Sequence, residues 1–136
     1  MLAPKRQKYR KQFRGVYKRI ATKANEVNFG QYGIKAAEAG WIKERQIEAV
    51  RVILARSTRK NGKFWIRIFP DKPLTQKPQG VTMGAGKGEV IGYAAVVSPG
   101  RVLFEIDGLP KEQVKKIFKV ISSKLAVKTI FTEKKL

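Results

Sequence analysis

The residues most suggestive of chemistry form a glycine-rich basic segment, Met83-Gly84-Ala85-Gly86-Lys87-Gly88. A phosphate-binding P-loop needs Gly-x-x-x-x-Gly-Lys followed by Ser or Thr. Counted back from Gly86-Lys87, the required first glycine is Val81, and Gly88 stands where the Mg²⁺-binding hydroxyl belongs. We therefore expect no ATP site here. A loop whose backbone presses against nucleic acid is the favoured interpretation, because glycine has no Cβ to hold a ligand away. An ordinary flexible loop is the alternative.

Residues suited to catalysis are scarce. The chain has no His and no Cys, which removes the commonest general base, the commonest metal ligand and any disulfide framework. Asp71, Glu105 and Asp107 are the candidate carboxylates. Glu105 and Asp107 stand two apart on an expected strand, where a paired acid/base site is conceivable, but a charge pair with Lys or Arg of a neighbouring strand is favoured. We predict no enzyme, no catalytic residue, no metal, no cofactor and no small-molecule substrate.

The charge balance points to a polyanionic partner. Lys and Arg number 30 against 10 Asp and Glu, a formal charge of +20, and repulsion on this scale disfavours a compact state without counter-charge. Nucleic acid fits best and an anionic membrane less well.

Hydrophobic residues make up 43% of the chain, so a core can form. No apolar run approaches the ~20 residues of a membrane span, and the charged N-terminus lacks the apolar segment of a secretory signal.

The first 25 residues are expected to be a basic RNA-binding arm, with residues 26–136 forming a single domain. The first acid is Glu26. Tyr9, Phe13 and Tyr17 recur every four residues and would share one stripe of a helix, where they either dock on the protein's own core or stack on bases. Phosphate contacts are expected from the arm's basic side chains: Lys5, Arg6, Lys8, Arg10, Lys11, Arg14, Lys18, Arg19 and Lys23.

The remaining sequence predicts an α+β fold, with a largely antiparallel sheet flanked by two helices. The first helix is expected from Ile42 to Lys60 and the second from Pro110 to Leu125, each with an apolar stripe. The expected strands cover 27–37, 64–69, 90–97, 102–106 and 127–131, with a stiff loop at 70–73 and the glycine-rich loop at 77–89.

RNA contacts are also expected outside the arm. Ile47, Val50 and Leu54 share one face of the first helix, and its basic residues fall roughly opposite; a merely solvated charged face is the alternative. The predicted RNA-binding residues, beyond the basic ones of the arm, are Tyr9, Arg45, Arg56, Arg59, Lys60, Arg67, Lys72, Lys77, Met83, Gly84, Gly86, Lys87 and Gly88.

Several short motifs, in order over nearly the whole chain, resemble the bacterial-type ribosomal protein L-sixteen family. They are Met1-Leu2-x-Pro4-Lys5-Arg6, Phe29-Gly30-x-Tyr32-Gly33, Arg45-Gln46-Ile47-Glu48-Ala49, Gly62-Lys63-x-Trp65-Ile66-Arg67, Phe69-Pro70-Asp71-Lys72-Pro73, Met83-Gly84-x-Gly86-Lys87-Gly88, Pro99-Gly100-x-Val102-Leu103 and Lys128-Thr129-x-Phe131. Each motif alone is weak, but their common register is specific.

The resemblance implies a structural protein of the large ribosomal subunit, in a bacterial cytoplasm or an organelle. It implies binding to large-subunit rRNA beside the aminoacyl-tRNA site, between the central protuberance and the peptidyl transferase region. Neighbouring ribosomal proteins and tRNA are the implied partners, with residues 1–25 and 77–89 reaching toward the tRNA sites, and a role in assembly and translation follows.

Two positions depart from the family pattern, and two other functions remain as alternatives. Thr82 stands where members usually carry Arg, which puts one loop contact in doubt, and Gly92-Tyr93 replaces two aromatics. The first rival is a free-standing architectural nucleic-acid-binding protein. The second is an enzyme acting on nucleic acid, which the lack of a cluster of acids for two metals disfavours.

Overall fold

The structure, a computed structural model, describes residues 2–6, 24–76 and 89–135. It confirms the α+β class, with two helices and seven strands among the described residues. In chain order the elements are β1 (Tyr32–Ala36), β2 (Gly40–Lys43), α1 (Glu44–Ser57), β3 (Lys63–Ile66), β4 (Lys72–Gln76), β5 (Glu89–Val97), β6 (Val102–Asp107), α2 (Lys111–Lys124) and β7 (Thr129–Glu133).

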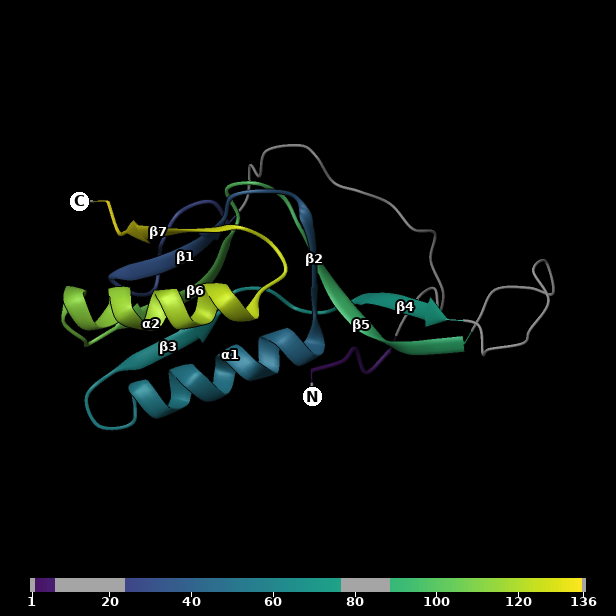
Figure 1. Cartoon of the computed structure of the whole chain (residues 1–136), viewed down its shortest axis with the longest axis horizontal. Helices are drawn as coiled ribbons and strands as arrows, with labels where there is room; N and C mark the ends of the chain where they lie inside the picture. The colour runs from purple at the N-terminus through teal and green to yellow at the C-terminus, as the bar shows by residue number, and fades with distance from the viewer. Residues whose placement is uncertain (1, 7–23, 77–88, 136) are drawn as a thin grey trace.

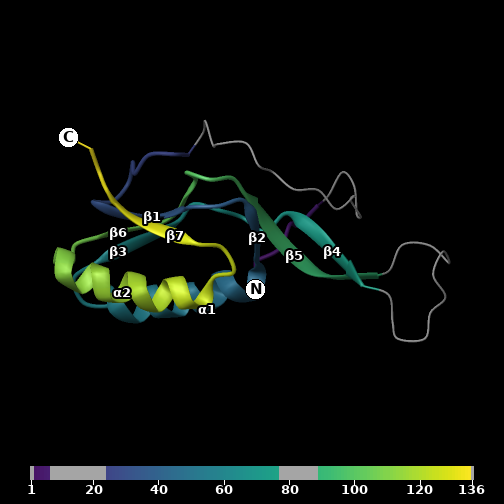
Figure 2. The same ribbon diagram turned by 45° about the horizontal axis from the view of Figure 1, so that its top comes forward.

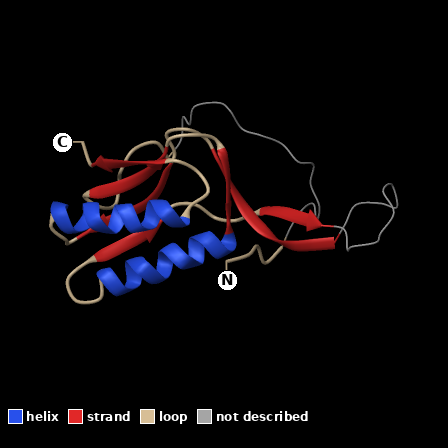
Figure 3. Cartoon of the chain, viewed as in Figure 1, coloured by secondary structure: helices blue, strands red, loops and turns tan. Residues whose placement is uncertain are grey.

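The strands form two antiparallel sheets. The larger has the order β3-β6-β1-β7 and the smaller has the order β2-β5-β4. Both helices lie side by side along one face of the larger sheet (Figures 1 and 2). The ladder of β4 and β5 extends away from this body, as Figure 3 shows in red. Residues 77–88 follow β4 and precede β5, so the glycine-rich segment belongs to the connection between them.

The core lies between the helices and the larger sheet. Ile47, Val50 and Leu54 of α1 are fully buried, as are Phe104 and Ile106 of β6. The spacing of the buried positions on α1 is the apolar stripe of an amphipathic helix. The stripe of α2 is formed in the same way by Val114, Ile117 and Ile121.

The first helix begins later than the sequence predicted. Residues 40–43 form β2, which pairs with β5 so that Ile42 lies opposite Ala95. Ile42 is fully buried, and its apolar character fits a helix stripe and a strand equally well. The helix also ends at Ser57 rather than Lys60. Its end is closed by the N–H groups of Thr58 and Gly62, which bond the carbonyl oxygens of Leu54 and Thr58 at 3.0 and 3.1 Å.

The predicted stiff loop at 70–73 is also partly wrong, because residues 72–76 form strand β4. Pro73 sits inside this strand, opposite Tyr93. Proline cannot donate to a β-ladder and is tolerated at a sheet edge, and β4 is an edge strand of the smaller sheet. The preceding strand, β3, ends at Ile66 instead of Phe69, although the N–H of Arg67 still bonds the carbonyl oxygen of Leu103 at 2.9 Å.

Candidate nucleic-acid interface

The outward face of α1 is basic, as the sequence predicted. Arg45 and Arg56 are exposed on the helix, and Arg59 and Lys60 are exposed just beyond its last turn. Within the described ranges, no carboxylate lies within ion-pair distance of any of these four side chains. They are therefore available to a polyanion.

An acid on this helix is neutralised locally. Glu48 accepts from Arg51, with Nε 2.9 Å from Oε2. That hydrogen bond, more than the charge attraction, lowers the pKa of Glu48 below its ordinary value and raises the pKa of Arg51. Both stay ionised at neutral pH, so the pair adds no net charge to the positive face.

A second group of cations lies where the smaller sheet meets the start of α1. Lys43 on β2 and Lys72 on β4 both pair with Ala94 of the central strand β5, so the three residues form one row across the sheet. The Lys72 ammonium lies 5.4 Å from the centre of the Trp41 ring. Lys43 and Arg45 line an open pocket together with Tyr93.

The first residues of the chain are anchored near the same region. Leu2 packs against the main hydrophobic core, and the purple segment of residues 2–6 begins near the start of α1 in both views (Figures 1 and 2). Lys5 and Arg6 are exposed. The other predicted RNA-binding residues lie outside the described residues: Lys8, Tyr9, Arg10, Lys11, Arg14, Lys18, Arg19, Lys23, Lys77, Met83, Gly84, Gly86, Lys87 and Gly88.

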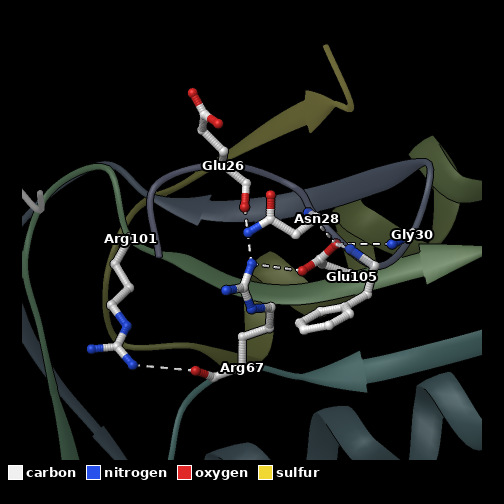
Figure 4. Close-up of polar contacts among 7 residues, drawn as sticks. Glu26, Asn28, Gly30, Arg67, Arg101 and Glu105 are labelled. Atoms are coloured by element: carbon white, nitrogen blue, oxygen red, sulfur yellow. Dashed lines mark hydrogen bonds and ion pairs between the residues drawn. The ribbon is translucent and has the colours of Figure 1, made fainter. Parts of the chain in front are cut away.

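Arg67 is placed differently from the other predicted RNA-binding residues. Its side chain is 14% exposed and its Nη1 donates to Glu105 Oε2 at 2.8 Å. The same nitrogen donates to the carbonyl oxygen of Glu26 at 2.9 Å (Figure 4). The guanidinium is thus held within the protein, and a contact between Arg67 and RNA stays a prediction that these bonds do not support.

Glu105 is a buried carboxylate with four hydrogen-bond donors. Its side chain is fully buried, and Oε1 accepts from the backbone N–H groups of Asn28, Phe29 and Gly30 at 3.0, 2.8 and 2.9 Å. A buried carboxylate is costly unless paired and hydrogen-bonded, and here it is both. The predicted charge pair with a cation next to a neighbouring strand is confirmed for Glu105.

Asp107 does not share this site, so the two carboxylates form no acid/base pair. Asp107 is exposed, and its Oδ1 accepts from the N–H of Gly108 at 2.8 Å. Among the described residues, no group of three His, Cys, Asp or Glu side chains is placed to hold a metal ion. None of the described helices is long and apolar enough to cross a membrane.

The sequence-based reasoning did not single out Phe29 as a surface residue. The residue is 57% exposed, although it stands two positions after the buried Val27. The sequence feature that could have indicated how the segment at 28–30 is placed is Glu105, which lies between Phe104 and Ile106 in a largely apolar strand. A carboxylate in such a place needs a donor from elsewhere in the chain, and the glycine-containing segment at 28–30 supplies three.

Comparisons with known proteins agree on one family. The family model described as Ribosomal protein L16p/L10e matches residues 4–132. A protein from Buchnera aphidicola subsp. Cinara cedri, named Large ribosomal subunit protein uL16, is 51% identical over 134 residues, covering 98% of each chain. Proteins of the same name from Hydrogenobaculum sp. and Aquifex aeolicus are 53% and 52% identical, over 93% of this chain and 90% and 89% of theirs.

Proposed function

This chain belongs to the ribosomal protein L16p/L10e family, and from that premise we propose that it is a structural constituent of the large ribosomal subunit. The observation that carries the proposal is the extent of the match, since the similarity spans 98% of both this chain and a relative named for the large subunit. Members of a ribosomal protein family are structural proteins, so no catalytic role is assigned. The relatives are bacterial, which favours a ribosome of the bacterial cytoplasm over an organellar one.

The direct partner is large-subunit rRNA, with neighbouring ribosomal proteins beside it. The charge of +20 requires a polyanion, because phosphate contacts by Lys and Arg supply most of the affinity of such interfaces. The exposed cations at and just beyond α1, together with Lys5 and Arg6, support this role. We place the binding site near the aminoacyl-tRNA site and the peptidyl transferase region, where the protein contacts tRNA and supports subunit assembly and translation.

Sedimentation tests the assignment to the subunit. Epitope-tagged protein in a cell extract should sediment with large subunits in sucrose gradients, and should stay there at salt concentrations that strip loosely bound basic proteins. A free-standing architectural protein would move to the top of the gradient or follow DNA. A cryo-EM map of the same subunits would then locate the chain relative to the tRNA sites.

The tRNA contact has its own test, at Lys87 in the segment that joins β4 and β5. This residue lies outside the described residues, and its role rests on its charge and on the flanking glycines. Large subunits reconstituted with Lys87→Ala should bind aminoacyl-tRNA more weakly than wild-type subunits, or assemble less completely. Lys116→Ala removes the same charge from an exposed position on α2 and should do neither. Equal behaviour of all three subunits would remove tRNA contact by this segment from the proposal.

A further inference from the structure

Phe29 is an apolar side chain that the fold holds at the surface. The residue is 57% exposed, yet its backbone is hydrogen-bonded to the core. The N–H groups of residues 28, 29 and 30 all donate to Oε1 of the buried Glu105. Gly30 is also tightly enclosed, because a Cβ there would lie 2.7 Å from the carbonyl oxygen of Ile106. The backbone position of Phe29 is therefore set by the core beneath it.

The ring of Phe29 has two fixed planar neighbours. The Trp65 ring is stacked beside it, with centroids 6.1 Å apart and planes inclined by 26°. The guanidinium carbon of Arg67 lies 5.0 Å from the centre of the Phe29 ring, a cation–π distance. Arg67 is itself held by Glu105 and by the carbonyl oxygen of Glu26 (Figure 4). The Phe29 ring thus packs against both Trp65 and the hydrogen-bonded Arg67.

The charged side chains around this surface are of both signs. Side chains alternate along a strand, so exposed Lys63 lies on the same face as Trp65 and Arg67, about 7 Å from Trp65 along the strand by the usual rise. β3 is an edge strand of the larger sheet, so this face has an open side. The Glu105 charge is buried and paired, and the Glu26 carboxylate turns away from Arg67 (Figure 4). Asp107, exposed and opposite Lys63 in the ladder, is a second acid nearby, so the preference for a polyanion comes from the charge of the whole chain.

We propose that Phe29, with Trp65 beside it and the largely buried Arg67 holding its ring, is a stacking platform for one unpaired base of large-subunit RNA, and that Lys63 contacts a phosphate flanking that base. Unpaired bases are bound in this way by aromatic rings and arginine planes, and the stacking tolerates any base because every base has a π face. A protein partner would also cover an exposed aromatic ring, but the charge of +20 favours a polyanion. The platform deepens the proposed function and rests on it.

The test compares Phe29→Leu with Phe29→Tyr in the full-length chain. Leucine keeps an apolar side chain but removes the ring, whereas tyrosine keeps the ring. Binding to purified large-subunit rRNA should weaken roughly ten- to hundredfold for Phe29→Leu, the usual effect of one lost stacking contact. Phe29→Tyr should bind like wild type. The slope of log affinity against log salt should be the same for all three proteins, because no phosphate contact is removed.

Ultraviolet crosslinking in assembled wild-type large subunits supplies a second readout, independent of variant folding. Mass spectrometry should find an rRNA nucleotide attached to Phe29 or Trp65. Crosslinks from these residues to a neighbouring ribosomal protein instead would overturn the platform, and so would equal affinities of the leucine variant and wild type. If Phe29→Leu lowers the unfolding midpoint, its weaker binding could come from unfolding. The crosslinks of the wild-type protein then decide whether the platform contacts RNA. Wild-type protein that fails to bind the rRNA would contradict the proposed function itself, whereas rRNA binding by Phe29→Leu with the full affinity of wild type would remove the platform alone.

Discussion

Among single residues, Glu105 and Arg67 show how one buried pair fixes a surface loop. The carboxylate accepts three backbone N–H groups on one oxygen and the guanidinium on the other. Replacing Arg67 by Met keeps much of the side-chain volume but leaves the fully buried carboxylate without its counter-charge. We expect Arg67→Met to lower the free energy of unfolding by about 3–5 kcal/mol, the usual cost of breaking a buried pair from one side. Urea denaturation followed by circular dichroism measures the change.

Arg51→Met is the matched control, because Arg51 also forms an ion pair with a glutamate, here Glu48. In that pair the side chains are 43% and 33% exposed, and exposed pairs contribute little. The control should leave the denaturation midpoint close to that of wild type. Similar midpoints for both variants would mean that the buried pair does not hold the fold together as inferred.

Gly30 makes a second residue-scale prediction. A Cβ at this position would lie 2.7 Å from the backbone oxygen of Ile106, which cannot move aside cheaply. Gly30→Ala should therefore destabilise the fold by about 1–3 kcal/mol, the usual cost of overpacking. Gly92→Ala is the control, because its Cβ would meet the end of the flexible Glu44 side chain at 3.1 Å. Thermal unfolding of both variants checks the difference, and an unchanged midpoint for Gly30→Ala would show that the loop has room to shift.

Charge pairing was easier to predict for Glu105 than for Arg67. A carboxylate between Phe104 and Ile106 must be satisfied if the strand is buried, and the sequence alone shows that neighbourhood. Arg67 looks like any other cation of a basic chain. Whether the Arg67 side chain points to solvent or into the protein depends on how β3 and β6 pair and on where residues 26–30 cross them. Neither can be read from the local sequence.

The two helices are the elements that hold the core, and α2 makes the sharpest test. Ile121 is fully buried, whereas its neighbour Val120 is 48% exposed. Ile121→Ala should lower the free energy of unfolding by about 2–5 kcal/mol, through lost burial and the cavity left behind. Val120→Ala should stay within about 0.5 kcal/mol, as surface changes do. Chemical denaturation of the pair measures both, and similar values would mean that α2 does not dock along the stripe described here.

Helix periodicity was the most reliable element-scale signal, and strand boundaries were the least. The apolar stripes of α1 and α2 follow directly from the sequence because a helix repeats over several turns. β2 is only four residues long, too short for its alternation to be told from the start of a helix. β4 was read as a loop because Pro73 suggests a break, and only its position at a sheet edge makes that proline acceptable.

On the scale of the whole molecule, the division into two sheets was not predictable from composition or spacing. The sequence indicated one sheet. No local sequence feature shows that β5 pairs with β2 and β4 in a separate sheet and not with the strands of the β3-β6-β1-β7 sheet. The net charge and the lack of His and Cys, by contrast, are properties of the whole chain and did indicate the class of partner. The charge of +20 therefore predicts that RNA is bound, while the fold decides which surface binds it.

The distribution of charge over the surface gives the last prediction. Arg56, Arg59 and Lys60 cluster at the end of α1, where we place rRNA contacts, and Lys115, Lys116 and Lys119 are also exposed, on α2. Each neutralised phosphate contributes about 0.7–0.9 to the slope of log affinity against log salt. Replacing the α1 cluster by glutamines should therefore reduce that slope by about 2–3, provided that all three side chains contact phosphates. Replacing the α2 cluster changes the net charge equally and should reduce the slope much less.

Filter binding to large-subunit rRNA over a salt series compares the two triple variants with wild type. Equal losses would show that RNA responds to total charge and not to a defined face of α1, and a larger loss from the α2 variant would move the interface to the other helix.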